Sequence, residues 1–431
     1  MKSCGLNILV LHRLGDPLTW RESMVEKELC LPKFAPDNNY LVHDYWLPLP
    51  DYVRDIAFDA IILTQTFLGA RVDPSMRMRL LDHYQSLLLS DFFKIALPQD
   101  DYSCNAILDK WLTNWNIDLN YSVCVNDWPI IYPSYSKSGS IKQGYTGYIS
   151  DSLIKKTINR KDIKSRGIDV AYRADKLSPA FGRLGLIKST FGERFSQASS
   201  ELKLNTDIST RPEDTIFGHL WYEFIEKARC MLGTNSGSSL LDPDGSINQS
   251  VIRYQMRYHN ATFDKVEQHC FPGLEGRYVF TMISPRNIEC AMLGTSQILA
   301  PGPYGNFMIP WQDFIPLEPD MSNFAEVAPL LSDHKFLQMI ADRCYEKILS
   351  YQELRYSNHV SELINEICTN TRITEVERQR STPLIKRYQQ ESELTADAFW
   401  RKQRLKIRTR KLLAEHGLRR AKYFLKDLFS V

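Results

Sequence analysis

The 431-residue sequence has no Cys-x-x-Cys pair, and its nine cysteines are scattered and odd in number. This pattern argues against a disulfide framework or a zinc site and indicates reduced thiols. No run of roughly 18 apolar residues occurs, which argues against a transmembrane helix. The short apolar run Ile8–Leu11 is interrupted at once by His12 and Arg13, so it indicates a first β-strand and not a signal peptide. These absences predict a cytoplasmic protein.

Charge is distributed unevenly along the chain. The net charge is +2, but residues 401–431 contain eleven lysines and arginines against two acids, which leaves residues 1–400 acidic. The segment Arg401–Lys411 has no acid at all. It is either a solvated terminus or a surface that meets anionic lipid at the inner face of the cytoplasmic membrane. We expect no nucleic-acid partner, because the body is acidic and no recognition module is visible.

Short apolar segments alternate with helical patterns through the first third of the chain. The strands expected there are Asn7–Leu14, Tyr40–Tyr45, Ala60–Phe67, Lys94–Pro98 and Leu119–Val125. Such alternation predicts a parallel sheet covered by helices. The pattern lapses across Ser134–Arg166, where Ser, Gly, Lys and Asp dominate, and this segment is the best candidate for a linker.

The alternation restarts after the linker. The strands expected in this second half are Gly167–Arg173, Thr206–Ser209, Cys230–Thr234, Tyr278–Ile283 and Gln297–Ala300, and helical patterns dominate after about residue 320. We therefore predict an α/β fold with two Rossmann-like domains that face each other across a cleft, followed by C-terminal helices. The predicted boundaries are 1–150 for the first domain, 151–165 for the linker, 166–375 for the second domain and 376–431 for a basic helical tail.

The stretch Ser284–Thr295 (SPRNIECAMLGT) is the first candidate for chemistry. It follows an expected strand, Ser284 suits a helix N-cap and Pro285 suits the first turn. Helix N-termini after parallel strands bind phosphates and sugar hydroxyls. Arg286 could offset diphosphate charge, and Glu289 could reach a ribose diol. An ordinary capped helix with a surface ion pair explains the same spacing.

The loop Gly233–Ser239 (GTNSGSS) is the second candidate. Its small residues Gly233, Asn235, Ser236 and Gly237 would let backbone N–H groups approach a diphosphate. No Gly-Lys-Ser/Thr follows, so the loop is not a Walker motif. A plain turn is an equally good interpretation.

Two cations and one turn complete the candidate set. Arg173 ends an expected strand and Lys188 follows a glycine-containing loop, so both could clamp a pyrophosphate without a metal. The alternative is that both cations face solvent, which is the usual arrangement for a lone lysine such as Lys188. The turn Gly302–Asn306 could place Tyr304 over a bound sugar, although a surface turn is nearly as good an explanation.

Taken together, these segments resemble the donor-domain signature of family-1-like bacterial glycosyltransferases of the GT-B fold. In those enzymes a helix of the form R-x-x-E-x-x-x-x-G-T follows a strand near the cleft, and here it runs from Arg286 to Thr295. The resemblance implies transfer of a sugar from a nucleoside-diphosphate sugar to a hydroxyl of a glycan or lipid-linked acceptor, in surface polysaccharide assembly. It implies that Glu289 holds the ribose and that no metal or other cofactor is needed.

One position departs from the family pattern. Many retaining members carry a second glutamate eight residues before the ribose-binding one, and here that position is Thr281. The stereochemical outcome is therefore open. Two rivals also remain open: a nucleotide-sugar epimerase of the same architecture, and a non-catalytic nucleotide-binding or scaffold protein.

An inverting transferase needs a base in the acceptor domain. The candidates are His12 and Asp16 after the first strand, and Asp100 and Asp101 after the strand Lys94–Pro98. These positions follow strand carboxyl ends, which face the ligand crevice in parallel sheets. A cap or turn role is the alternative for each of them.

Overall fold

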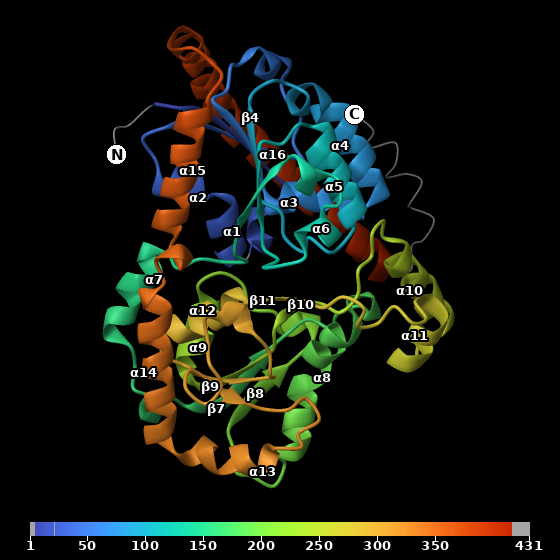
Figure 1. Ribbon diagram of the computed structural model, residues 1–431, viewed down its shortest axis with the longest axis vertical. Coiled ribbons are helices and arrows are strands. Elements are labelled where there is room, and N and C mark those ends of the chain that lie inside the picture. Colours follow the sequence, from blue (N-terminus) through green and yellow to red (C-terminus); the bar gives the residue numbers. More distant parts are fainter. Residues whose placement is uncertain (1–4, 21, 416–431) are drawn as a thin grey trace.

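The computed structural model describes residues 5–20 and 22–415. Its strands form two parallel sheets with helices on both faces of each, and the two units are stacked along the long axis of the molecule (Figure 1). The predicted arrangement of two Rossmann-like domains is confirmed.

The first sheet has six parallel strands in the order β2-β1-β3-β4-β5-β6. Their bounds are β1 Asn7–His12, β2 Asn39–Asp44, β3 Ala60–Leu63, β4 Phe93–Ala96, β5 Leu119–Ser122 and β6 Ser140–Gln143. The helices of this half are α1 Glu22–Glu28, α2 Cys30–Phe34, α3 Gln65–Leu68, α4 Pro74–Leu88, α5 Asn105–Asn114 and α6 Trp128–Ile131. Helix α7 (Asp151–Lys156) already packs on the second domain, because its Leu153 belongs to the core of that domain. The five expected strands are all present. Strand β6 lies inside the segment predicted to be a linker, because its polar sequence at the sheet edge gives no apolar signal.

The central strand β1 is buried on both faces, which explains its continuous apolar sequence. Leu9 and Leu11 belong to a core that includes side chains of α4 and α5. Ile8 and Val10 point to the opposite face and belong to a second core. This alternation fixes which face of the sheet each helix covers.

The second sheet has the order β13-β12-β9-β7-β8, also parallel. Its strands are β7 Ile168–Arg173, β8 Thr206–Ser209, β9 Ala228–Gly233, β12 Ser296–Leu299 and β13 Ile315–Pro316, beside an antiparallel pair of β10 Ser236–Ser238 and β11 Phe280–Met282. The helices are α8 Gly182–Ala198, α9 Leu220–Lys227, α10 Ser246–Arg257, α11 Phe263–Cys270, α12 Pro285–Met292, α13 Phe324–Val327 and α14 His334–Ser350. Helices α10 and α11 were not expected from the sequence.

The two domains share packed surface at one end of their junction. Phe280 of β11 belongs to the core of the first domain, and its ring stacks on Tyr102 at a centroid distance of 5.7 Å. Nearby, the backbone N–H of Cys104 donates to the carbonyl of Asp242 at 2.7 Å. These contacts set the spacing of the domains at the edge of the cleft.

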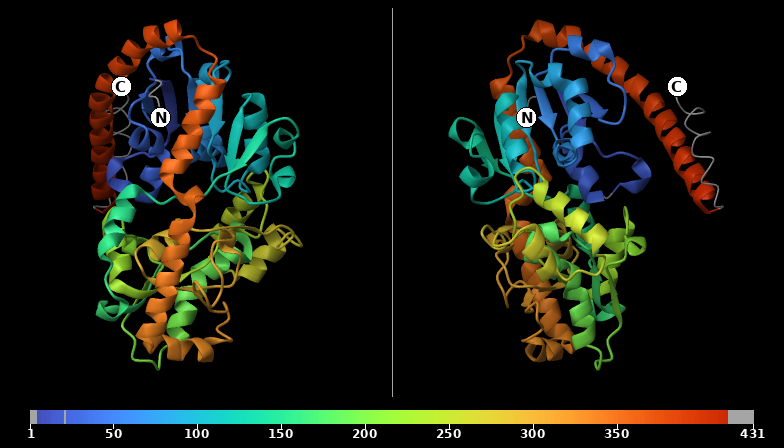
Figure 2. Two further views of the ribbon diagram at one scale, coloured as in Figure 1. Left: turned by 60° about the vertical axis from the view of Figure 1, so that its left-hand side comes forward. Right: turned by 90° about the vertical axis from the view of Figure 1, so that its right-hand side faces the viewer.

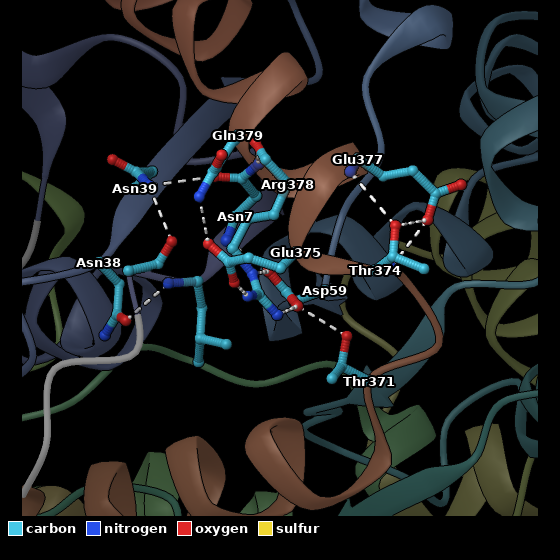
Figure 3. A network of polar contacts seen from close by, with 12 residues as sticks. Asn7, Asn38, Asn39, Asp59, Thr371, Thr374, Glu375, Glu377, Arg378 and Gln379 are labelled. Atoms are coloured by element: carbon cyan, nitrogen blue, oxygen red, sulfur yellow. Dashed lines mark hydrogen bonds and ion pairs between the residues drawn. The ribbon is translucent and has the colours of Figure 1, made fainter.

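The C-terminal helices return to the first domain. Helix α15 (Tyr356–Asn370) shares a core with β1, although the sequence places it in the donor segment 166–375. Helix α16 (Glu375–Glu415) then begins in a polar network in which Arg378 pairs with the fully buried Asp59 at 2.7 Å (Figure 3). The part of the predicted basic tail that follows residue 415 lies outside the described residues.

Candidate functional site

Helix α12 begins at the junction of the two domains. Ser284 is its N-cap in a capping box with Asn287, and Pro285 occupies the first turn, as the sequence predicts. The short strand before the helix, β11, pairs with β10 outside the main sheet. The first turn of α12 lines one cleft together with Ser23 and Met24 of the first domain.

Glu289 lies one turn into α12 and is almost completely buried. The indole N–H of Trp221 donates to its carboxylate at 2.7 Å. Burial raises the pKa of Glu289 to about 7, because desolvation outweighs the Trp221 hydrogen bond and the charge of Arg286. A carboxyl group held near its protonation midpoint inside a cleft is typical of a functional site.

Arg286 presents its guanidinium between two aromatic rings. Its charged carbon lies 5.4 Å from the ring centroid of Tyr172 and 5.5 Å from that of Trp221. One terminal nitrogen donates to the carbonyl of Arg173. Its Nε is buried and has no acceptor within the described part of the chain. An unsatisfied buried donor is costly, so this N–H favours a bound anion.

A cleft of about 290 Å³ brings these residues together with both domains. Six predicted site residues line it: Arg173, Lys188, Ser236, Ser284, Arg286 and Glu289. The first domain contributes Ser23, Met24 and Gln99 to the opposite wall. The volume falls at the lower end of the range for ligand pockets.

Arg173 plays a different part from the one that the sequence suggests. Its Nη2 pairs with the Asp207 carboxylate at 2.7 Å, and its Nε donates to the carbonyl of Asp214 at 3.2 Å. Its Nη1 donates to two further backbone carbonyls, those of Tyr172 and Asp207. With these donors engaged, the guanidinium holds the loop after β8 in place, and Arg286 is the better candidate for a phosphate contact.

The loop Gly233–Ser239 contributes mainly through packing. A β-carbon at Gly237, whose φ is +138°, would lie 1.8 Å from the carbonyl oxygen of Phe280, so glycine is required for the β10–β11 pairing. Gly233 has Leu299 at 2.7 Å from its β-carbon position. Of the predicted residues in this loop, Ser236 lines the cleft, and Gly233, Asn235 and Gly237 are not among the lining residues.

Asn235 and Tyr304 form a contact that joins two loops. The amide of Asn235 accepts the backbone N–H of Tyr304 at 3.3 Å. The Tyr304 ring is fully buried, and its hydroxyl donates to the carbonyl of Ala300 at 2.6 Å. This packing corrects the expectation that the phenol covers a bound sugar. Thr281, the departure from the family pattern, pairs with Gly237 across the β10–β11 ladder.

The residues after β1 are constrained by local bonds. His12 is buried, its Nδ1 accepts the N–H of Leu14 at 3.3 Å, and burial lowers its pKa to about 4. The ring is therefore neutral near pH 7, with its proton on Nε2. Asp16 caps the turn Pro17–Thr19 and pairs with Arg404 of α16 at 3.1 Å. Both side chains already have structural partners, and neither lines the cleft of helix α12.

The residues after β4 also have partners. Asp101 is fully buried and accepts hydrogen bonds from the hydroxyls of Ser122 at 2.6 Å and Tyr132 at 2.7 Å. This burial corrects its assignment as a base that faces an acceptor. Asp100 is partly exposed and accepts from the Tyr102 hydroxyl at 2.8 Å. Neither carboxylate lines the cleft.

Several residues of the cleft carry no signal in the sequence. Trp221 lies on α9, and Arg211 and Asp214 form an ion pair of 2.8 Å on the loop after β8. Ser23 lies on α1 and Gln99 follows β4, so both come from the other domain. Only the fold places them opposite α12.

The described residues, 5–20 and 22–415, show neither a metal cluster nor a membrane span. No group of three or more His, Cys, Asp or Glu side chains gathers there as a metal-binding cluster. No helix in the same residues is long and apolar enough to cross a bilayer.

No family model and no curated protein sequence matches the chain. Solved structures match it in fold. An α-glucosyltransferase in complex with UDP and a DNA containing an HMU base has a TM-score of 0.50 at 11% identity, over 84% of this chain and 99% of that one. Anabaena HepE in complex with UDP-glucose has a TM-score of 0.43 at 11% identity, over 84% of this chain and 100% of that one. Sucrose-phosphate synthase from Thermosynechococcus elongatus has a TM-score of 0.41 at 10% identity, over 84% of this chain and 99% of that one.

Identities this low show the fold alone. The chain is a two-domain α/β protein of the GT-B fold, as the sequence predicts. Its cleft lies between the domains, and most of the cleft residues come from the second of them.

Proposed function

We propose that the protein is a glycosyltransferase that moves a sugar from a nucleoside-diphosphate sugar to a hydroxyl of a glycan or a lipid-linked acceptor. The observation that carries this proposal is that Arg286 and Glu289, on the first turns of α12, both line a cleft to which both domains contribute. The GT-B fold supports it, and the α-glucosyltransferase that shares this fold is in complex with UDP.

Each group has a role in this proposal. The Glu289 carboxylate accepts hydrogen bonds from the ribose diol. The Nε–H of Arg286 and the ammonium of Lys188 face the diphosphate. When the acceptor hydroxyl attacks the anomeric carbon, the bond to the diphosphate oxygen breaks and negative charge grows on the leaving group. Fixed cations stabilise that charge more in the transition state than in the ground state, and no metal is needed.

The direct test is nucleotide binding by the full chain. UDP, GDP and dTDP are screened for thermal stabilisation, and Glu289→Ala is compared with Glu326→Ala, an exposed glutamate on α13. We expect stabilisation by at least one nucleotide, and at least tenfold weaker binding for Glu289→Ala alone. No stabilisation by any of the three contradicts the transferase. Turnover of the donor to an isomeric sugar nucleotide, without transfer or hydrolysis, assigns the epimerase instead.

We also propose a place for this reaction. The acceptor belongs to surface polysaccharide assembly, and the protein works in the cytoplasm at the inner face of the membrane. The support is the exposed, cation-rich end of α16, where Leu405 is 58% and Ile407 is 64% exposed. Flotation with phosphatidylglycerol vesicles compares the full chain with Lys402→Gln/Lys406→Gln/Arg408→Gln. Equal binding by both proteins contradicts the membrane role.

A further inference from the structure

Three tryptophans from distant parts of the chain meet at the loop after β1. The indole N–H of Trp20 donates to the carbonyl of Gly15 at 3.0 Å. A β-carbon at Gly15 would lie 3.6 Å from Nε1 of Trp46 and 3.7 Å from Cη2 of Trp400. Gly15 has a φ of +78°, a conformation that glycine adopts without strain. All three indoles are only partly buried, so this cluster is not a sealed core.

Charged groups surround the indoles. The Asp44 carboxylate accepts the backbone N–H of Trp46 at 3.0 Å, and burial raises its pKa to about 6. The guanidinium of Arg79 lies 5.7 Å from the ring centroid of Trp46 and donates to the Trp46 carbonyl at 3.1 Å. Asp16, next to Gly15, pairs with Arg404. The cluster therefore combines the flat apolar faces of the indoles with neighbouring carboxylate and guanidinium groups that can form hydrogen bonds.

The position of the cluster links it to the cleft. Strands β1 and β2 end there, and the carboxyl ends of parallel strands form the ligand-binding edge of such a sheet. Trp20 is three residues before Ser23, which lines the cleft opposite α12. Helix α16 descends beside the first domain to the level where the domains meet (Figure 2). Its Trp400 lies against Gly15 in the loop after β1.

We propose that Trp20, Trp46 and Trp400 form a subsite for a pyranose unit of the acceptor. A pyranose has an apolar face of C–H groups and a rim of hydroxyls. An indole offers a flat apolar face with one N–H donor, and the neighbouring carboxylates and guanidinium suit the hydroxyls. This subsite rests on the proposed function and adds the chemical class of the acceptor: it carries a sugar ring next to the hydroxyl that reacts.

Fluorine NMR of the full chain tests the subsite. Labelling with 5-fluorotryptophan gives one signal for each of the eight tryptophans, and single Trp→Phe variants assign them. The protein is titrated with the methyl glycosides of glucose, galactose, mannose and N-acetylglucosamine. We expect at least one of them to shift the signals of Trp46 and Trp400 saturably. The signal of Trp311, which is 39% exposed in the other domain, stays fixed as the control.

The same spectra separate this inference from the proposed function. Trp221 lines the donor cleft, so UDP, GDP or dTDP should shift its signal. If Trp221 responds to a nucleotide but no pyranoside moves Trp46 or Trp400, the subsite is refuted and the transferase stands. If Trp221 responds to none of the three, the proposed function fails. Shifts of Trp46 and Trp400 with phosphatidylglycerol vesicles and with no pyranoside refute the subsite as well, because the indoles then belong to a membrane contact.

A variant adds a second measurement. Trp400→Ala should abolish the pyranoside response of Trp46, because the two rings lie against the same glycine. The nucleotide response of Trp221 should be retained, which shows that the variant folds. An unchanged pyranoside response of Trp46 contradicts the shared subsite.

Discussion

Replacing Glu289 with glutamine should stabilise the protein while weakening its binding of nucleotide. Burial raises the pKa of this carboxyl to about 7 from its ordinary value of 4.5. A raised carboxyl pKa means that the folded state binds a proton more tightly than the unfolded state, so stability is lost as pH rises between these two values. The difference corresponds to a cost of about 3 kcal/mol above pH 7. Glutamine keeps an acceptor for the Trp221 indole and carries no charge.

The variant and the wild type should therefore be equally stable near pH 4.5 and differ most at pH 8. For a chain of this length, unfolding entropy amounts to about 0.9 kcal/mol per degree, so the gain is about 3 °C in Tm. Thermal melts over this pH range measure it, with the exposed Glu326→Gln as the control. If Glu289→Gln is not more stable at pH 8, burial does not destabilise this carboxylate and the argument for a strained functional group fails.

Nucleotide binding should show the opposite effect. The ribose diol binds the ionised carboxylate best, so the affinity of the wild type should rise as pH passes through 7. The Glu289→Gln variant should bind about tenfold to a hundredfold more weakly at pH 8, since hydrogen bonds to charged groups contribute about 1.5–3 kcal/mol. Calorimetric titration at pH 6 and pH 8 checks both statements. A variant that keeps wild-type affinity at pH 8 refutes the ribose assignment.

Three further substitutions follow from the structure. Arg286→Ala should weaken UDP binding at least tenfold and leave uridine binding unchanged, because in our proposal the buried Nε–H contacts the diphosphate. Calorimetric titration measures both affinities, and equal losses for UDP and uridine count against this role. Asp59→Asn should lower the free energy of unfolding by about 3–5 kcal/mol, because Arg378 loses its buried charged partner. A lower Tm and faster proteolysis within α16 measure this loss. Gly237→Ala should lower Tm, because its β-carbon would lie 1.8 Å from the Phe280 carbonyl; an unchanged Tm means that the β10–β11 pairing is looser than described.

Most of the fold could be predicted from local patterns. Strands such as β1 are buried on both faces, so an uninterrupted apolar run marks them in the sequence. Helix α14 (His334–Ser350) lies in the region after about residue 320 where helical patterns dominate in the sequence. The start of α16 could not be predicted, because its polar first turns are held by the pair Arg378–Asp59, whose members are 319 residues apart. No local pattern reports such a partner.

The site residues that share one helix could also be predicted from the sequence, whereas those that depend on partners from other elements could not. Ser284, Arg286 and Glu289 share one helix, so their spacing alone brings them together, and the structure places all three at the cleft. Arg173 and Asp101 were judged by residue type and strand position, which do not show whether a charge is already paired. Arg173 is engaged by Asp207, and Asp101 is buried beneath two hydroxyls. Whether a charged side chain serves a ligand or the fold depends on partners from other elements.

Contacts between distant elements also join the basic end of the described chain to the first domain. The first half of α16 is part of the first domain, since the Tyr388 hydroxyl lies 2.6 Å from Nδ1 of the buried His43. The second half brings Trp400 and Arg404 against the loop at Gly15 and Asp16. A partner that binds the cations beyond Arg404 therefore acts on a helix fixed at both places. Binding there should change the surroundings of Trp400, at the loop after β1, before it changes those of Glu289. The fluorine signals of Trp400 and of Trp221, which donates to Glu289, report these two changes separately.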